Sequence, residues 1–284
     1  MGKLSASKVA SGFGCAFVVL AALGIDYFLK TMYATGALIL FLAVASTVEF
    51  SSIFARKGVR LPSVFLVVTV SAPLLLLLSS SAETEEFFFW LPFFISAVLI
   101  GAYALSLLNN PTPEGALTAA FTLTGFLHLG LGFIFFAAHL FIPPASSANP
   151  YVGWLALFIF VVKANDILGY ILGSSFGRRG TLHPISPNKS IEGSLFGFFG
   201  GIGISLLVWY LFALPNFSIW KASLFGVIVG PLSQASDLAE SLLKRYCGTK
   251  DSGSLIPASG GFFDFADCFL LPAPASYLFL RILV

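Results

Sequence analysis

Charged residues are scarce in this chain of 284 residues: they make up 10% of it, whereas a soluble globular protein carries about 25%. Hydrophobic residues make up 57%. A water-soluble core cannot hide that much apolar surface, so the bilayer must act as the solvent for most of the chain. The composition therefore excludes a soluble globular enzyme and predicts an all-α, polytopic integral membrane protein.

Cysteine and several catalytic motifs are also missing or rare. The three cysteines, Cys15, Cys247 and Cys268, form no C-x-x-C pair and no zinc pattern, so neither disulfides nor thiol chemistry has support. The sequence lacks a P-loop, a dinucleotide fingerprint, H-E-x-x-H and G-x-S-x-G. His128 and His139 stand in or near one apolar window, where packed or interfacial histidines are more common than metal ligands.

Apolar windows of about 20 residues recur along the chain, separated by Asn-Pro and Pro-Pro punctuation. The first follows Lys3 and Lys8 without a convincing cleavage site, and we interpret it as a retained span rather than a signal peptide. The windows predict about nine transmembrane helices, at roughly 9–29, 34–54, 61–80, 87–108, 116–142, 150–173, 194–214, 219–240 and 267–283. Two polar loops, 174–193 and 241–266, stand out by length.

Basic residues predict the orientation of these spans. With a cytoplasmic N-terminus, outside segments hold Lys30, Lys221 and Arg281, and Lys163 lies within a span. The inside segments then hold Lys3, Lys8, Arg56, Lys57, Arg60, Arg178, Arg179, Lys189, Lys244, Arg245 and Lys250. Both long loops therefore face the cytoplasm, where their six basic residues favour an anion such as a phosphate. The alternative is that these cations only set the topology.

Acidic residues gather where the eighth window ends. Asp237, Glu240 and Lys244 follow i, i+3, i+7 and share a helical face, and Asp264 and Asp267 share another if a helix starts near residue 263. Aspartates without nearby histidine are hard oxygen ligands suited to Mg²⁺, which also binds substrate phosphates. The spacing therefore indicates a magnesium site, with a second cation left open. The alternative is an interfacial acid–base network that fixes loop geometry.

A separate acid lies in the sixth window. Asp166 follows Lys163 by about one turn, and helical spacing puts both on one face with Tyr170. A charge at this depth is costly unless it is paired or wet. Asp166 is therefore either a site residue or half of a Lys–Asp pair that neutralises itself within the bundle.

The run SLLKRYCGTKDSGSLIPASGGFFDFAD, residues 241–267, resembles the signature of phosphatidate cytidylyltransferases, the CDP-diacylglycerol synthases. Upstream, SDLAE resembles the family's G-D-L-x-E-S, ISPNKSIEG resembles its S-P-K-K-[ST]-x-E-G loop, and residues 165–178 match a further segment loosely. Glu49 resembles the acid of an early acid–aromatic pair. The signature positions in register are Ser241, Lys244, Arg245, Lys250, Asp251, Pro257, Gly260, Gly261, Asp264 and Asp267.

Two positions depart from the family pattern. Ser259 stands where the family has His, and Phe265 stands where it has Arg. The three aspartates of the family's metal site are retained. A divergent or catalytically impaired relative therefore stays an alternative, because the substrate-phosphate contacts differ while the metal ligands do not.

The resemblance implies cytidylyl transfer from CTP to phosphatidic acid, giving CDP-diacylglycerol and pyrophosphate in phospholipid biosynthesis. It implies Asp237, Asp264 and Asp267 as metal ligands, with Lys250 and Asp251 joining them as catalytic residues. The Gly260–Gly261 pair would bring backbone N–H groups to an anion, unless it only forms a turn. The implied substrate-binding residues are Lys189, Lys244, Arg245, Ser186, Asn188, Glu240, Gly260, Gly261 and Asp166.

We expect a single membrane domain over 1–284, with N-terminal spans in 1–145 and the catalytic spans and cytoplasmic loops in 146–284. The small-residue content is compatible with a homodimer. The compact length favours a bacterial plasma membrane, and nothing indicates a nucleic-acid partner. The alternative enzyme is a CTP-dependent polyprenol or phytol kinase. A transporter or interaction protein is the alternative of another class, and the confinement of charge to one end argues against it.

Overall fold

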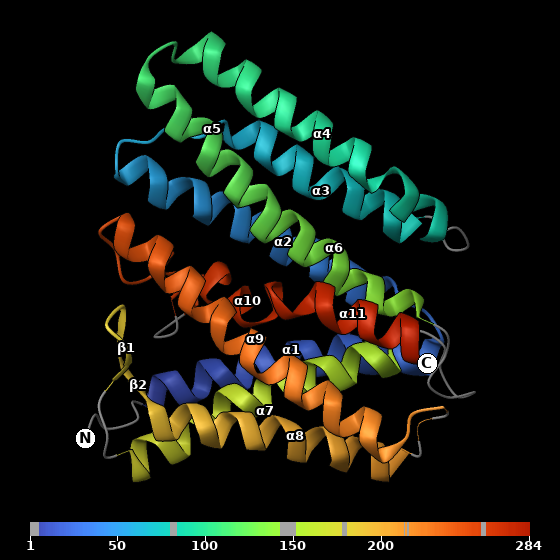
Figure 1. Cartoon of the computed structure of the whole chain (residues 1–284). Helices are drawn as coiled ribbons and strands as arrows, with labels where there is room; N and C mark the ends of the chain where they lie inside the picture. Colours follow the sequence, from blue (N-terminus) through green and yellow to red (C-terminus); the bar gives the residue numbers. More distant parts are fainter. Residues whose placement is uncertain are drawn as a thin grey trace.

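The computed structural model describes the backbone of residues 6–79, 84–142, 152–177, 181–212, 214, 216–256 and 260–284, and their side chains except at 6–13, 84, 181, 182 and 188. Within these ranges the chain is a bundle of helices with one small hairpin (Figure 1). Each apolar window predicted from the sequence overlaps a helical segment. The first helices are α1 (Ala6–Leu29), α2 (Tyr33–Arg56), α3 (Ser63–Ser79), α4 (Thr84–Asn109), α5 (Pro113–Gly125) and α6 (Leu131–Ala138), followed by α7 (Gly153–Phe176), α8 (Ile191–Phe212), α9 (Ile219–Tyr246), α10 (Phe262–Leu270) and α11 (Pro272–Leu283).

Two long helical segments, α5 with α6 and α10 with α11, are interrupted by irregular turns. A π-turn, Phe126–Gly130, joins α5 to α6, and a 3₁₀ turn, His139–Phe141, ends α6. Proline at position 272 separates α10 from α11, because it has no N–H to continue the helical ladder. The kink lies about one turn after Asp267 of α10 and so bears on the site.

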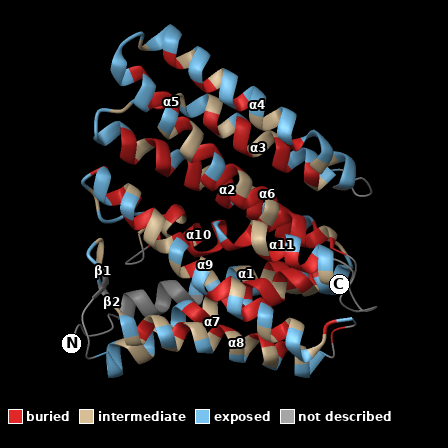
Figure 2. Ribbon diagram, viewed as in Figure 1, coloured by how far each residue is buried: buried red, intermediate tan, exposed pale blue. Residues whose placement is uncertain are grey.

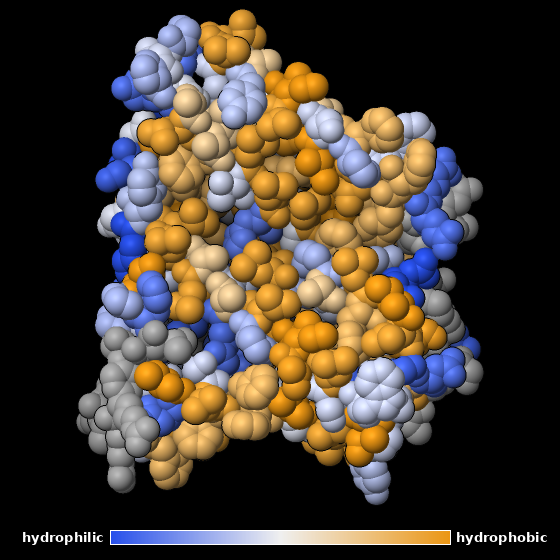
Figure 3. Space-filling model, in the orientation of Figure 1, coloured by the Kyte–Doolittle hydropathy of each residue, from blue (hydrophilic) through white to orange (hydrophobic). Residues whose placement is uncertain are grey.

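Six described segments are long and apolar enough to cross a membrane by length and composition: α2, α4, α5 with α6, α7, α8, and α10 with α11. Residues 14–29 and 63–79 form shorter apolar helices, and α9 is not among the six. In Figure 3 an apolar band lies between hydrophilic left and right edges. The chain is thus an all-α membrane protein, and the expected count of nine spans with a cytoplasmic N-terminus stays a prediction.

The bilayer explains where the hydrophobic residues lie. Figure 2 shows buried residues gathered toward the middle of the bundle, and exposed residues on outer helices such as α4 and α8. Large apolar side chains remain exposed; Phe28, Leu108 and Ile282 are each more than three-quarters exposed. Exposure on that scale is stable only against lipid, which confirms the expectation drawn from composition.

The two polar loops are shorter than predicted. Within the predicted loop 174–193, α7 continues to Phe176, and an antiparallel hairpin of β1 (Thr181–His183) and β2 (Ser186–Ser190) leads directly into α8. Within the predicted loop 241–266, α9 continues to Tyr246, because Glu240 and Lys244 pair at i, i+4 and both are buried. Gly248, with φ of 71°, ends α9 in the left-handed conformation that glycine accommodates.

Helices α7, α8 and α9 pack against one another, and α9 also contacts α10 and α11. In Figure 1, α7 and α8 lie below α10 and α11, and α9 crosses between them. The α7–α8 contact depends on small residues: a Cβ on Gly173 would lie 2.7 Å from the Gly193 Cα. Helix α10 also packs against α2, so the N-terminal half of the chain touches the segment that carries Asp264 and Asp267. This contact links the two halves that the sequence analysis treated separately.

Candidate active site

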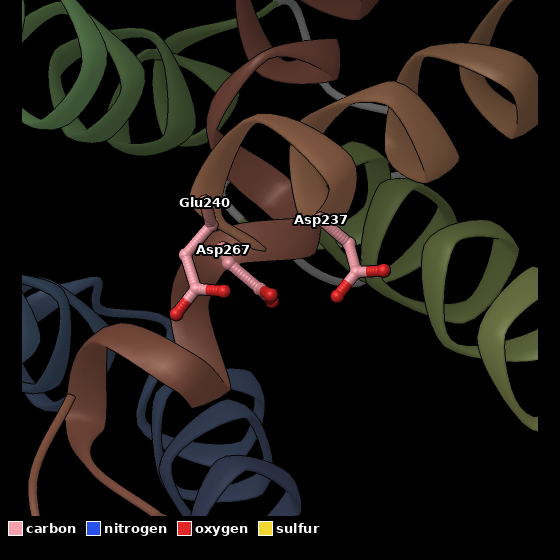
Figure 4. A group of neighbouring side chains, drawn as sticks. All are labelled: Asp237, Glu240 and Asp267. Carbon is pink, nitrogen blue, oxygen red and sulfur yellow. The ribbon is translucent and has the colours of Figure 1, made fainter. Parts of the chain in front are cut away.

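Helices α9 and α10 bring three carboxylates together. Asp237 and Glu240 lie one turn apart on α9 and Asp267 lies on α10; one oxygen of each lies within 4.8 Å of the others. Glu240 and Asp267 are buried, and Asp237 is half-buried. Figure 4 shows the three side chains directed into the same space. We call Asp237, Glu240 and Asp267 the carboxylate trio.

The trio is chemically suited to a hard divalent cation. Three acids this close repel one another, and burial makes the repulsion costlier than in water. The Glu240 Oε1 atom is buried and has no hydrogen-bond donor among the described residues. A buried acceptor without a donor is destabilising unless a ligand satisfies it. Carboxylate oxygens in this arrangement match the donor set of Mg²⁺.

Asp264, predicted as a metal ligand, lies outside the trio. Its Oδ1 atom is 2.5 Å from the Lys244 Nζ, and its Oδ2 atom accepts from the Ser252 N–H at 2.8 Å, the Ser252 hydroxyl at 2.6 Å and the Gly261 N–H at 2.7 Å. These donors occupy both oxygens. Glu240, predicted to bind substrate, takes the place in the trio that the sequence analysis gave to Asp264, because the helical phase of α9 points Glu240 toward Asp267.

Lys244 also lies differently from the prediction. Its ammonium group is buried between Glu240, at 2.6 Å, and Asp264, at 2.5 Å. A lysine held by two buried carboxylates neutralises them and fixes their positions, instead of presenting its charge to a substrate from solution. These ion pairs place Lys244 behind the trio, and its contact with substrate stays a prediction.

Glu49 of α2 holds the same loop from the other side. Its Oε2 atom accepts from the Phe263 N–H at 2.9 Å and lies 2.9 Å from the Ser252 hydroxyl, whose single hydrogen it shares with Asp264. A Cβ on Gly261 would lie 2.1 Å from that oxygen, so any other residue there would displace the Glu49 carboxylate. The N–H of Gly261 approaches an anion as predicted, but this anion is the carboxylate of Asp264. The early acid–aromatic pair was the sequence signal for Glu49.

Ser236 fixes the kink between α10 and α11, and sequence reasoning missed this role. Its hydroxyl oxygen accepts from the Leu271 N–H at 3.1 Å and donates to the Asp267 carbonyl. These two backbone groups would bond each other in a regular helix, so the Ser236 hydroxyl is inserted into the ladder. The insertion ties α10 to α9 at the residue that carries the Asp267 carboxylate.

A cavity of about 150 Å³ adjoins the trio between α7, α8, α9 and β2. Three residues that the sequence predicted for the site, Asp166, Lys189 and Asp237, line this cavity. Lys189 forms an ion pair with Asp237 across it. Its walls also contain Asn165, Gly169, Tyr170, Gly173, Ser174, Ser190, Gly193, Ser194, Ser233, Gln234 and Cys268. The hairpin therefore places the Lys189 cation next to the half-buried Asp237 acid at this cavity.

An amide network that the sequence analysis did not identify supports this cavity. The Gln234 side chain donates to the Asn165 Oδ1 atom and to the Ser194 carbonyl, both at 2.9 Å, and accepts from the Ser194 hydroxyl. These bonds join α7, α8 and α9. Two amides inside apolar windows were the available signal, because such groups are retained in lipid only where they find partners.

Lys163 does not pair with Asp166 in the described structure. Its Nζ atom lies 3.3 Å from the Cys268 Sγ atom and 4.7 and 4.6 Å from the ring centroids of Phe265 and Phe269. Cation–π contacts of this length stabilise a desolvated ammonium group. Phe265, which departs from the family pattern, thus forms part of an aromatic site for Lys163.

The remaining predicted residues are dispersed around this centre. Arg245 is exposed in the last turn of α9, and Lys250 and Asp251 are exposed beyond its end. The Arg245 guanidinium donates to the Thr249 carbonyl at 2.9 Å. Gly260 adopts a φ of 97° and forms a β-bridge with Ile256. Ser186 lies in β2 and is half-buried. Asn188 lies in the same strand, but its side chain is outside the described part of the structure, and Pro257 and Ser259 lie wholly outside it.

Comparison with known proteins gives a consistent result. A phosphatidate cytidylyltransferase of Synechocystis is 43% identical over 124 residues, 43% of this chain and 41% of that protein. A phosphatidate cytidylyltransferase of Staphylococcus epidermidis is 36% identical over 160 residues, 55% of this chain and 56% of that protein. One of Bacillus subtilis is 33% identical over 194 residues, 66% of this chain and 70% of that protein. The chain thus matches about half the length of the first two relatives. The sequence model of the cytidylyltransferase family matches residues 9–283, so the chain belongs to that family.

Proposed function

We propose that the chain transfers the cytidylyl group of CTP to phosphatidic acid, giving CDP-diacylglycerol and pyrophosphate. The observation that carries this proposal is the carboxylate trio beside a cavity that Lys189 closes. The relatives named phosphatidate cytidylyltransferase support the choice of substrates. CTP and phosphatidate would be the only partners this chemistry requires besides the bilayer.

The reaction needs no general base from the protein. Phosphate monoesters have a second pKa of about 6, so phosphatidate carries a nucleophilic oxygen at neutral pH. That oxygen attacks the α-phosphorus of CTP in line and forms a new P–O bond. The bond from the α-phosphorus to the bridging oxygen breaks, and pyrophosphate leaves with its electron pair. The site accordingly consists of carboxylates, lysines and amides.

The main barrier is the approach of two polyanions, and the protein has to offset their repulsion. We assign Asp237, Glu240 and Asp267 as the residues that would hold Mg²⁺, which when bound neutralises phosphate charge on the substrates and leaving group. Lys189 would exchange its carboxylate partner for a phosphate oxygen. Lys244 and Asp264 keep Glu240 in place, and the Arg245 and Lys250 cations extend the positive edge beyond α9.

The position of the cavity fits a lipid substrate and a nucleotide that arrive by different routes. Its volume of about 150 Å³ is below the roughly 300–1,000 Å³ of sites that enclose a whole ligand, so it suits the reacting phosphates. On α7, the lining residue Tyr170 and its neighbour Ile171 are exposed, and lipid tails would lie there. We infer an active site at the cytoplasmic face of a bacterial plasma membrane.

Product analysis tests the proposal. The purified protein in detergent is given radiolabelled CTP with and without phosphatidate and Mg²⁺, and pyrophosphate and labelled lipid are measured. We expect both products only when all three components are present, and loss of turnover by at least about a hundredfold in Asp267→Asn. A phosphorylated lipid with release of CDP would instead identify a lipid kinase. CTP binding without turnover by the folded protein would identify an impaired relative.

A further inference from the structure

A second and larger cavity, of about 670 Å³, lies away from the carboxylate trio. It is enclosed by the turn between α2 and α3, the end of α4 and the start of α5. Figure 1 places both turns at the edge of the bundle that also carries the β-hairpin and the end of α9. The lining residues are Lys57, Gly58, Val59, Arg60, Leu61, Pro62, Leu105, Ser106, Asn109, Asn110, Glu114, Leu117 and Thr118.

Two exposed cations stand at this cavity. Lys57 and Arg60 form no ion pair with any residue in the described ranges. The Lys57 Nζ atom lies 5.6 Å from the ring centroid of Tyr246, at the end of α9, a cation–π contact that leaves the charge without a counter-anion in the described structure. Glu114 is the one acid in the lining and is exposed, so the balance of charge in the lining is positive.

A buried hydroxyl gives an independent sign of a ligand. Ser106 lines the cavity, is only 5% exposed, and its Oγ atom has no hydrogen-bond partner among the described residues. A buried hydroxyl is nearly always hydrogen-bonded, because leaving it without a partner is destabilising. A phosphate or ester oxygen in the cavity would accept from it.

The apolar surroundings identify the ligand as an amphiphile. Leu105 and Leu117 line the cavity together with the polar groups. On the adjoining surface of α4, Leu107 and Leu108 are 68% and 79% exposed. Acyl chains can therefore run along α4 while a headgroup lies between the two turns. A free nucleotide would gain nothing from this apolar face.

We propose that this cavity binds the phosphate-bearing headgroup of an anionic phospholipid, with Lys57 and Arg60 as its counter-cations and the Ser106 hydroxyl as a donor. The lipid would be a bound ligand here and not a substrate, because none of the carboxylate trio lines this cavity. The site is a property of the N-terminal helices and does not depend on the proposed reaction.

Native mass spectrometry in a neutral detergent tests this proposal without an activity measurement. The probes are dioctanoyl phosphatidylglycerol, dioctanoyl phosphatidylcholine and inorganic phosphate. We expect tight binding of the phosphatidylglycerol, weakened roughly tenfold or more in the double variant Lys57→Gln/Arg60→Gln, since each surface cation contributes measurably to anionic-lipid binding. The choline lipid should show no such difference. Lys30→Gln, at the opposite end of α2, is the matched control and should bind as the wild type does.

Ser106→Leu keeps both cations and fills the cavity, and it should also weaken binding of phosphatidylglycerol. The exposed double variant keeps the test informative if Ser106→Leu does not fold. Equal binding by wild type and double variant would overturn the proposal, as would an equal loss in Lys30→Gln. Binding of inorganic phosphate through Lys57 and Arg60 without binding of phosphatidylglycerol would overturn it in favour of a free-anion site.

Discussion

Glu240 and Asp264 are both acids near Lys244, and their different surroundings give them different roles. Asp264 receives four donors from Lys244, Ser252 and Gly261, whereas the Glu240 Oε1 atom has none among the described residues. A carboxylate with both oxygens satisfied has little left for a cation. The local donors, more than the residue type, decide which acid can be a ligand.

Metal binding therefore distinguishes the two acids. In Glu240→Gln we expect Mn²⁺ affinity, followed by electron paramagnetic resonance as a substitute for Mg²⁺, to fall by more than about a hundredfold. In Asp264→Asn it should fall by only about ten- to a hundredfold, as for a residue that positions a ligand. Glu86→Gln, which changes an exposed acid in the first turn of α4, is the control and should match the wild type. The reverse order of Glu240 and Asp264 would restore the ligand set predicted from the sequence.

At the scale of the element, the kinked rod of α10 and α11 has to be attached to α9 in one register. Proline breaks the ladder, and the Ser236 hydroxyl takes up the Leu271 N–H and the Asp267 carbonyl. The Asp267 carboxylate therefore takes its position from a contact that belongs to neither helix alone.

Removal of that hydroxyl should weaken both stability and activity. Ser236→Ala leaves two buried backbone groups without their partner, which costs about 1–3 kcal/mol and lowers the unfolding temperature in detergent. If the groups bond each other instead, α10 straightens and Asp267 moves, so turnover falls while stability recovers. Ser223→Ala is the control on the same helix, because that exposed hydroxyl bonds only to the Ile219 carbonyl. Unchanged stability together with unchanged turnover in Ser236→Ala would contradict this account.

For the whole molecule, the distribution of charge sets the direction in the membrane. Basic residues, the β-hairpin and the end of α9 share one edge of the bundle, and Glu85, Glu86 and Arg281 lie at helix ends that the sequence analysis places outside. With the predicted cytoplasmic N-terminus, the positive-inside rule predicts that the carboxylate trio lies on the cytoplasmic side.

Cysteine labelling of intact cells tests this orientation. In a Cys15→Ala background, Cys247 and Cys268 are buried and should react little. We expect an impermeant maleimide to label Glu86→Cys in intact cells, and Ser254→Cys only after permeabilisation, since both positions are exposed at opposite ends of the bundle. Labelling in the opposite order would reverse the proposed topology, and would place the site outside the cytoplasm.

The helices of this chain were predictable from local sequence, and the lengths of its loops were not. The apolar windows predicted every helical segment because burial in lipid depends on composition over about 20 residues, which is a local property. Loop lengths were less predictable: the continuation of α9 to Tyr246 depends on pairing and burial of Glu240 and Lys244, and the hairpin at 181–190 depends on its packing between α7 and α8.

The sequence by itself determined the membrane setting, the family and most of the acids and bases of the site, because composition and spacing are written in the chain. Only the tertiary structure decided which acids face one another. Helical phase directs Glu240 toward Asp267, whereas Lys244, Ser252 and Gly261 occupy Asp264. It also joined Glu49 to the site across more than 200 residues of chain. Such contacts depend on the packing of distant helices, which no local pattern specifies.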